Sequence, residues 1–520
     1  MATVFSSSLY RFSSWALLGA FVAMLNACGG SQSSQSDLQE YRKRERIAKS
    51  PAKTDTVVKE DPPASGKMRP LAFPEVQSST LKNGLAVHSV QWTKLPIVYA
   101  TLVLRRGQAS DPKALPGVVS VLAGMLKQGT RKHSSKALAD AVEFYGASLS
   151  VSSDADSFYV RMRCLRDNFP QLLALMAEVV TQPTFPRREF KKLITRRLNR
   201  LRLRRNEPRY LAREALYREL YTLGGSDHPY ARVDTDEKAL KKMRTRDLQR
   251  WHRKQMLPNN AFLVVVGDMD ARAVTTQSDL AFKRWKRGKV PAFSLPKIPP
   301  TLSERYITVV NRPGSVQSVI YIGNLALTRS SSDYVPLRVV NQVLGGSAAS
   351  RLFMDLREKR SLTYGAYSAV VEREGTAPFV ASAAVRTEVT AEAMQAFFEH
   401  LVRINPEAPP ADELKNAQRY LNDHFPLSID TPGKILSLIV EQQRYGLAAD
   451  YWDHFRTQVA AVTPDAALKA ASQYVCKPAD GCSVVIVGDA SKIAQSLSAV
   501  AAVNIVDRDG ALIRKIETKP

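Results

Sequence analysis

The sequence predicts an α+β protein made of two similar halves, each a mainly antiparallel sheet with helices packed on one face. Each half ends in an apolar strand that closes in Gly-Asp, at residues 258–268 and 482–489. A proline-rich stretch over residues 286–300 separates the halves, and in both halves strands precede and follow pairs of helical patterns. A chain of 520 residues is also too long for a single core. Together these features indicate a distant duplication of one α+β unit.

Turn and cap residues place the elements within each half. In the first half, strands are predicted over residues 81–90 and 97–104, with two more within 147–164. Ser134-Ser135 favours the start of a helix over residues 136–145, Gly146 ends it, and a second helix is predicted over 168–180. In the second half, strands are predicted over residues 316–324, 365–372 and 378–386, and helices over 334–344, 391–402 and 412–424.

The first residues have the pattern of a targeting segment. Arg11 is followed by an apolar run over residues 15–25 and then by Leu25-Asn-Ala-Cys28. That tetrapeptide resembles a bacterial lipobox, so Cys28 is the predicted lipidation site. Gly29 after the cysteine, in place of Asp, indicates the periplasmic face of the outer membrane in a bacterial cell envelope. The alternatives are an ordinary secretory signal or an uncleaved anchor.

These patterns divide the chain into five predicted segments. Residues 1–28 form the lipoprotein signal peptide, and residues 29–70, which are poor in apolar side chains, form a flexible tether. Two folded domains are predicted over residues 71–285 and 304–510, with a linker over 286–303 between them. No later stretch has the unbroken apolar length of a membrane span.

The net charge of +25 admits either an anionic partner or an ordinary solvated basic surface. The densest basic run, residues 196–205, alternates arginine with leucine and predicts an amphipathic helix with an arginine-rich face. No aromatic-interleaved basic motif accompanies it, so nucleic acid is not predicted as a partner. A solvated surface is therefore the favoured interpretation, and an anionic membrane stays open.

Three cysteines remain besides Cys28. Cys476 and Cys482 could close a short disulfide loop in an oxidising compartment, and the sequence leaves open whether they do. Cys164 lies in a predicted strand without a neighbouring base, which favours a small buried hydrophobic residue over a nucleophile.

One stretch of fourteen residues carries the most specific information. Gly117-Val-Val-Ser-Val-Leu-Ala-Gly-Met-Leu-Lys-Gln-Gly-Thr130 resembles G-x-A-H-x-x-E-H-M-x-x-x-G-T of the insulinase/pitrilysin zinc peptidases. In that family the two histidines hold zinc on one helix face and the glutamate activates water. Here the working positions are Ser120, Ala123 and Gly124. The resemblance puts the third zinc ligand of the family at or near Arg200, and a guanidinium cannot ligate zinc.

The resemblance extends over residues 81–489, and it has a second specific motif. Gly345-Gly-Ser-Ala-Ala-Ser-Arg-Leu-Phe353 is followed by Leu356-Arg-Glu-Lys-Arg-Ser-Leu-Thr-Tyr364. In the family an Arg and a Tyr of this motif bind the substrate backbone and help to stabilise the developing oxyanion. The resemblance therefore implies that Arg357 and Tyr364 are substrate-binding residues. The alternative is that Arg357 pairs at a helix end while Tyr364 packs against a strand.

Fold and function follow from this resemblance as expectations. The fold would be a clamshell like that of mitochondrial processing peptidase. Some members of the family are heterodimers of a zinc-bearing and a zinc-free subunit. We therefore expect no catalytic residue, metal ligand or cofactor in this chain, which would lend Arg357 and Tyr364 to a partner that carries H-x-x-E-H and the zinc. A peptide would be the substrate, and it could also add as a strand along an edge such as residues 146–153. The alternative is a peptide-binding or scaffolding pseudopeptidase of the cell envelope with no role in hydrolysis.

Overall fold

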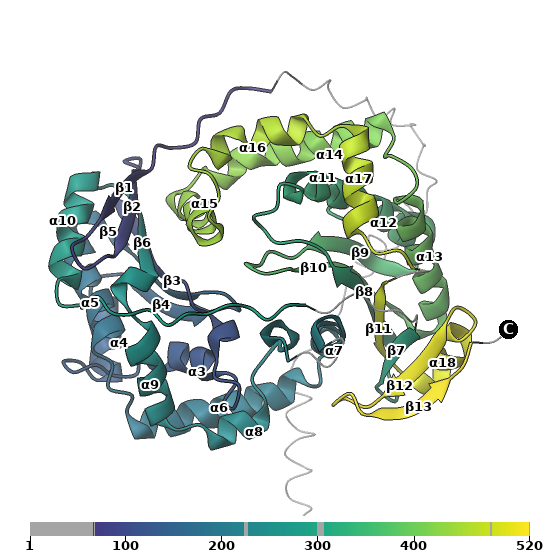
Figure 1. Cartoon of the computed structure of the whole chain (residues 1–520), viewed down its shortest axis with the longest axis horizontal. Coiled ribbons are helices and arrows are strands. Elements are labelled where there is room, and N and C mark those ends of the chain that lie inside the picture. Colours follow the sequence, from purple (N-terminus) through teal and green to yellow (C-terminus); the bar gives the residue numbers. More distant parts are fainter. Residues whose placement is uncertain (1–65, 67, 223–226, 299–305, 479–480, 519–520) are drawn as a thin grey trace, which may run out of the picture. The chain divides into compact units, whose positions relative to one another are not determined.

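Each half of the chain forms one sheet, and the two sheets share a strand order (Figure 1). The first sheet has the order β1-β2-β6-β3-β5-β4, and the second has the order β13-β12-β7-β11-β8-β10-β9. Five strands correspond, because β2-β6-β3-β5-β4 and β7-β11-β8-β10-β9 have the same relative directions. In each set the first pair is parallel and the others are antiparallel. This confirms the predicted α+β fold of two duplicated halves.

This computed structural model describes residues 66, 68–222, 227–298, 306–478 and 481–518. The strands of the first sheet are β1 (Gln77–Thr80), β2 (Ala86–Gln91), β3 (Ile97–Leu104), β4 (Ser148–Ser153), β5 (Phe158–Leu165) and β6 (Ala261–Gly267). Those of the second are β7 (Tyr306–Asn311), β8 (Gln317–Leu325), β9 (Thr363–Val370), β10 (Pro378–Arg386), β11 (Ser483–Gly488), β12 (Ala502–Val506) and β13 (Leu512–Ile516). The second sheet thus continues past residue 510. Cys28 and the other residues of the predicted signal peptide lie outside the described part.

The two strands that end in Gly-Asp are β6 and β11, which occupy equivalent inner positions of the two sheets. Every residue of β6 and β11 is buried, as expected for strands covered on both faces. Each pairs with a parallel neighbour on one side and an antiparallel neighbour on the other. The repeated sequence signature therefore marks the centre of each half.

The helices predicted over residues 136–145, 168–180, 334–344, 391–402 and 412–424 form within a residue or two of those bounds, whereas the one predicted over 196–205 begins earlier, at Arg187. The first half contains α3 (Val118–Met125), α4 (Ser135–Phe144), α5 (Phe169–Thr181), α6 (Arg187–Arg204), α7 (Pro208–Thr222), α8 (Glu237–Lys242), α9 (Thr245–Gln255) and α10 (Ala271–Phe282). The second contains α11 (Tyr334–Leu344), α12 (Arg351–Phe353), α13 (Thr390–Arg403), α14 (Ala411–His424), α15 (Pro432–Tyr445), α16 (Tyr451–Ala460), α17 (Pro464–Tyr474) and α18 (Ala490–Leu497). Of these, the helices α7–α10, α12 and α15–α18 were not predicted. The Ser134 hydroxyl accepts a hydrogen bond from the Ala137 amide at 3.2 Å and caps α4, and Gly146 follows that helix with φ of +57°.

One helix of each half packs on the sheet of the other half. The helix α7 lies against β8 and β11, and α15 lies against β3 and β6. Four apolar residues of α15 share a buried cluster with first-sheet strands: Ile435, Leu436, Ile439 and Val440. Leu216 and Tyr217 of α7 share another with Val319 and Val485 of the second sheet. The prediction of helices on one face is thus incomplete, because the second face of each sheet takes an exchanged helix.

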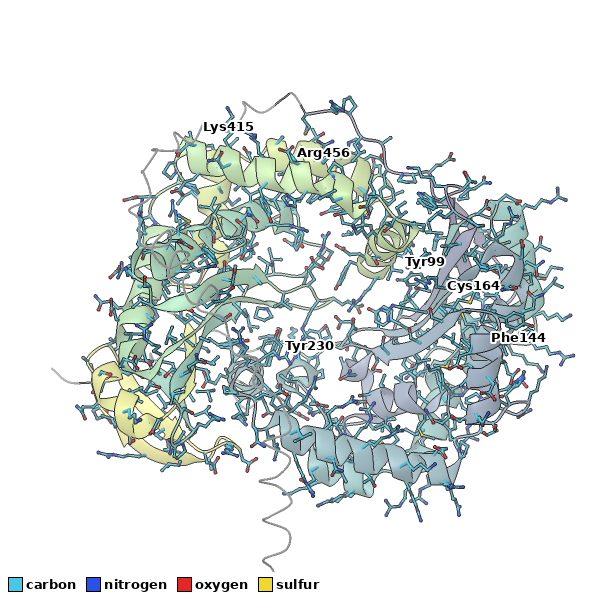
Figure 2. All side chains as sticks on the ribbon, turned by 180° about the vertical axis from the view of Figure 1, so that it is seen from behind. Tyr99, Phe144, Cys164, Tyr230, Lys415 and Arg456 are labelled. Atoms are coloured by element: carbon cyan, nitrogen blue, oxygen red, sulfur yellow. A yellow bond between two sulfur atoms is a disulfide. The ribbon has the colours of Figure 1, made fainter. Side chains whose placement is uncertain are left out.

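Residues 68–520 form one compact unit that contains both sheets and their buried clusters. Within the described residues, no helix combines the length and apolar character needed to cross a membrane. The sulfurs of Cys476 and Cys482 form a disulfide with a Cα–Cα distance of 5.2 Å, which settles the pairing that the sequence left open. Cys164 is buried in β5, and burial raises the pKa of its thiol to about 12, as expected for a structural residue (Figure 2).

The exchanged helix α7 carries a buried carboxyl, Glu219, to the second sheet. Burial raises the pKa of Glu219 to about 7, against opposing contributions from Thr308 of β7 and from Arg218. The unfolded chain releases this proton near pH 4.5, whereas the folded chain keeps it up to about pH 7. The free energy of unfolding should therefore fall as pH rises through this window, by on the order of 3 kcal/mol from this group.

We expect Glu219→Gln to remove this part of the pH dependence, because the amide stays neutral at every pH. The measurement is urea unfolding at about pH 4.5, 6 and 8, followed by circular dichroism. The matched control is Glu207→Gln, whose side chain is exposed just before α7. An unchanged slope in Glu219→Gln would show that this carboxyl does not couple folding to pH.

Candidate peptide-binding site

The stretch that resembles the zinc motif folds as expected, as the helix α3. Its N-terminus is held by Asp111, whose carboxylate oxygens accept hydrogen bonds from the amides of Gly117 at 2.6 Å and Val119 at 2.8 Å. Burial raises the pKa of Asp111 to about 7, although these two hydrogen bonds lower it. Met125 is fully buried. Gly117 and Met125, which the motif retains, are therefore packing residues of the first half.

The face of α3 that would hold zinc contacts Arg197 of α6. The Arg197 guanidinium donates to the Ser120 hydroxyl at 2.7 Å and to the Ser120 carbonyl at 2.5 Å. Burial lowers the pKa of Arg197, and nearby Asp234 raises it. The Arg197 guanidinium thus occupies the space beside Ser120 and places a fixed positive charge there. The resemblance put the third ligand position at or near Arg200, and the structure places Arg197, one turn earlier, against α3. The packing of the two helices decides which side chain faces inward.

Gly124 lets α6 approach α3 closely. A Cβ atom at Gly124 would lie 2.9 Å from Leu193 Cδ2 and 3.3 Å from Arg197 Nη2. A histidine at this position would overlap both side chains, so the loss of the motif and the close packing of the two helices belong together. Within the described residues, no three His, Cys, Asp or Glu side chains converge on a point that could hold a metal ion.

Arg357 and Tyr364 lie together on the surface of the second half. Residues Met354–Lys359 form a π-helical turn, a conformation that often marks functional positions. The Arg357 guanidinium carbon lies 4.8 Å from the centre of the Tyr364 ring and 4.7 Å from that of Phe353. Its Nε atom is 3.3 Å from Glu358 Oε1, and the Tyr364 side chain is 87% exposed. A cation and a phenol donor therefore point into solvent side by side.

The other side of the π-helical turn is fixed by Asp355. Its carboxylate lies 2.9 Å from His400 Nε2 of α13 and 3.1 Å from Arg360 Nε. These contacts lower the pKa of Asp355 even though burial opposes the shift. The ionised Asp355 thus joins the turn to α13, and the turn presents Arg357 from a rigid base.

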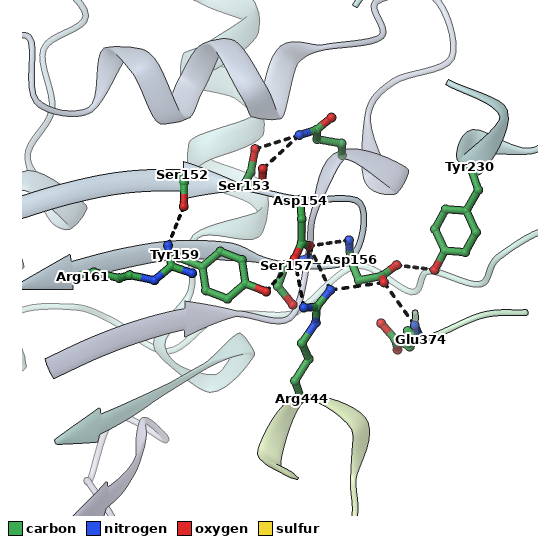
Figure 3. A network of polar contacts seen from close by, with 11 residues as sticks. Ser152, Ser153, Asp154, Asp156, Ser157, Tyr159, Arg161, Tyr230, Glu374 and Arg444 are labelled. Atoms are coloured by element: carbon green, nitrogen blue, oxygen red, sulfur yellow. Dashed lines mark hydrogen bonds and ion pairs between the residues drawn. The ribbon is translucent and has the colours of Figure 1, made fainter. Parts of the chain in front are cut away.

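The predicted peptide-accepting edge, residues 146–153, contains the edge strand β4 of the first sheet. Its end is held by polar contacts, with Arg161 Nη1 donating to Ser152 Oγ at 2.6 Å and Tyr159 OH donating to Asp154 at 2.7 Å (Figure 3). The strand β9, which begins with Thr363 and Tyr364, is the edge of the second sheet. Both sheets therefore end in a strand with no further strand beside it, the position at which a strand can be added. Some backbone groups of these edge strands already have partners, because the Ser368 amide donates to the Gly345 carbonyl at 2.9 Å and Lys127 Nζ donates to the Leu149 carbonyl at 2.7 Å.

Beyond β4, a polar network joins the two halves. Arg444 of α15 lies 2.9 Å from Asp154 and 3.3 Å from the buried Asp156, and Asp156 also accepts hydrogen bonds from Tyr230 OH and, at 3.1 Å, from the Glu374 amide (Figure 3). Burial alone would lower the pKa of Arg444, but the carboxylates of Asp154 and Asp156 raise it above its usual value. The sequence did not predict this network, because the partners of Asp154 and Asp156 lie far along the chain, at Tyr230, Glu374 and Arg444.

The two corresponding sheets define a fold of two similar halves. The helix α3 stands where zinc peptidases carry their metal motif, and Arg357 lies beside Tyr364, so the protein is of a metallopeptidase-like class. The profile for Insulinase (Peptidase family M16) matches residues 87–230, and the profile for the Peptidase M16 inactive domain matches residues 242–421. The chain belongs to the insulinase (peptidase M16) family, as the resemblance implied, and its residues 242–421 match the inactive domain of that family.

The relatives include proteins named as zinc proteases and one protein named as a non-peptidase homolog. The Zinc protease PqqE of Helicobacter pylori is 23% identical over 395 residues, 74% of this chain and 87% of that protein. The Non-peptidase homolog YmxG of the same organism is 23% identical over 275 residues, 52% and 62% of the two chains. A solved peptidase M16 inactive domain from Pseudomonas fluorescens superposes with a TM-score of 0.72 at 26% identity and covers 80% of this chain and 98% of its own.

Proposed function

We propose that this chain is the non-catalytic subunit of a heterodimeric insulinase-type zinc metallopeptidase. It would supply Arg357 and Tyr364 to a partner that carries H-x-x-E-H and the zinc. One observation carries the proposal: the Arg–Tyr pair faces solvent, while Arg197 fills the place beside Ser120 where this chain would need a metal. The pair has the chemistry of oxyanion stabilisation, and among the described residues no three His, Cys, Asp or Glu side chains could hold a metal ion for it to act with.

The relatives support a division of roles between two chains. Helicobacter pylori has one relative named as a zinc protease and another named as a non-peptidase homolog. In the proposed complex, a peptide would be held along a sheet edge such as β4 or β9. The zinc held by the partner's H-x-x-E-H motif would supply the activation of water. This chain would bind and orient the peptide and stabilise charge on the carbonyl oxygen.

We also propose that the complex works at the cell envelope. Lipidation at Cys28 would anchor the chain on the periplasmic face of the outer membrane. The disulfide between Cys476 and Cys482 supports this proposal, because disulfides persist in oxidising compartments such as the periplasm.

The test combines this chain with a zinc-bearing family member and follows the cleavage of a fluorogenic peptide. We expect hydrolysis that neither chain shows alone. Arg357→Ala and Tyr364→Ala in this chain should each lower kcat/KM by about a hundredfold, as does the loss of one oxyanion donor elsewhere. Zinc bound by the partner should stay unchanged.

Arg419→Ala, at an exposed arginine of α14, is the matched control and should leave the rate unaltered. Equal rates for the wild type, Arg357→Ala and Tyr364→Ala would exclude the proposal. The alternative, a peptide-binding scaffold, draws support from the two edge strands β4 and β9, which have no further strand beside them. It predicts that this chain binds an unfolded peptide by itself and never stimulates hydrolysis.

A further inference from the structure

The basic charge of the chain is concentrated in one segment. Residues 187–254 contain 22 lysines and arginines against nine acidic residues, a net charge of +13 out of the total +25. This segment includes α6, α8 and α9, and α6 lies beside α8 at one side of the first half (Figure 1). The positive charge is therefore uneven along the chain, because one segment of 68 residues carries about half of the net charge.

A pocket of about 630 Å³ lies between α6 and the segment that joins α8 to α9. Five cationic residues and no acidic residue line it: Arg187, Lys191, Lys241, Arg244 and Arg246. Two of these have partners, because Lys241 pairs with Glu237 at 2.7 Å and Arg244 donates to the carbonyls that end α8. The other three have no carboxylate partner among the described residues. Such a site is built to receive an anion.

The floor of the same pocket is apolar. Four residues form it: Phe190, Ile194, Leu240 and Met243. Their buried or half-buried side chains lie beneath cations that are exposed at the rim. A pocket with an apolar floor and a cationic rim fits an anion that carries an apolar part, whereas a fully hydrated anion such as free phosphate would gain nothing from the floor.

We propose that this surface binds the anionic phospholipids of a membrane, with a lipid phosphate among Arg187, Lys191 and Arg246. Exposed cations nearer the pocket extend the contact: Arg188 and Lys192 on α6, and Arg250, Arg253 and Lys254 on α9. Single-stranded nucleic acid would need exposed aromatic side chains for base stacking, but Phe190, Tyr210 and Trp251 are buried here. The proposal rests on charge and shape alone and does not depend on the proposed role in peptide cleavage.

The test uses residues 68–520, the compact unit that contains both sheets, so that the N-terminal segment cannot contribute to binding. Co-sedimentation is measured with phosphatidylcholine vesicles, with and without phosphatidylglycerol. We expect binding only to the anionic vesicles, with an affinity that falls as salt rises. The double variant Lys191→Gln/Arg246→Gln should bind roughly thirtyfold more weakly, as expected for the loss of two cations near an anionic surface.

The control variant Lys415→Gln/Arg419→Gln removes the same charge from exposed positions of α14, where Lys415 projects outward (Figure 2). It should bind nearly as the wild type does. A second variant, Arg187→Gln/Lys191→Gln, should repeat the loss, and circular dichroism confirms that each variant is folded. Equal losses in the pocket and control variants would overturn the proposal. Tighter binding to a single-stranded oligonucleotide than to anionic vesicles would overturn it as well.

Discussion

Gly117→Ala should lower the free energy of unfolding by about 4 kcal/mol. Gly117 begins α3 with φ of +94°, a conformation that L-residues adopt only with strain. A Cβ atom there would lie 2.0 Å from the buried Thr235 Oγ1 and 2.2 Å from its Cγ2, so the backbone would have to move. The measurement is chemical unfolding of both proteins, followed by circular dichroism.

Gly146→Ala is the matched control for this prediction. Gly146 also has a positive φ, +57°, but no atom lies within 4 Å of the added methyl group. This substitution should therefore cost only the backbone strain, about 1 kcal/mol. Equal losses for the two variants would mean that α3 is not held by close packing at its N-terminus. The expected difference would explain why the helix keeps its framing glycine without the zinc ligands.

Arg444→Met should lower the free energy of unfolding by about 4 kcal/mol. The arginine pairs with Asp154 and with the buried Asp156, and methionine fills a similar volume without the charge. Asp156 would then remain buried with only Tyr230 and the Glu374 amide as partners. Removing one partner of a buried ion pair leaves an uncompensated charge, which is the costly case. Thermal and urea unfolding measure the loss.

Arg386→Met provides the comparison, because Arg386 pairs with Glu388 at 3.0 Å while both side chains are largely exposed. An exposed ion pair contributes little, so this variant should lose less than about 1 kcal/mol. A loss in Arg444→Met no larger than that of Arg386→Met would show that the network does not hold the two halves together. The double variant Arg444→Met/Asp156→Asn should recover part of the loss, because it also removes the isolated charge.

Gly117 and Arg444 each hold one element in place by a contact with residues far along the chain. Gly117 fixes α3 within the first half, whereas Arg444 joins α15 of the second half to the end of β4 in the first. The edge strand that could accept a peptide is therefore anchored by a residue of the other half. Substitutions at Arg444 should alter both stability and the position of that edge.

Features set by neighbouring residues could be predicted from the sequence, whereas contacts between distant residues could not. Alternating apolar residues, caps and glycines predicted the strands and helices well, for example α4 between Ser134 and Gly146. The strands β1, β7, β12 and β13 were not predicted. Each has only four to six residues, which is too few alternations to distinguish a strand from a loop. The exchange of α7 and α15 was not predicted either, because an apolar helix face does not indicate which sheet it will cover.

The sequence by itself determined the duplicated α+β fold, the family and the loss of the zinc motif at Ser120, Ala123 and Gly124. It could do so because these properties depend on residue type at fixed local spacing. Only the tertiary structure decided that Arg197 rather than Arg200 closes the face of α3, that Arg444 joins the halves and that five cations surround one pocket. Such contacts depend on the rotation and separation of packed elements, and residues that lie hundreds of positions apart meet only when the chain is folded.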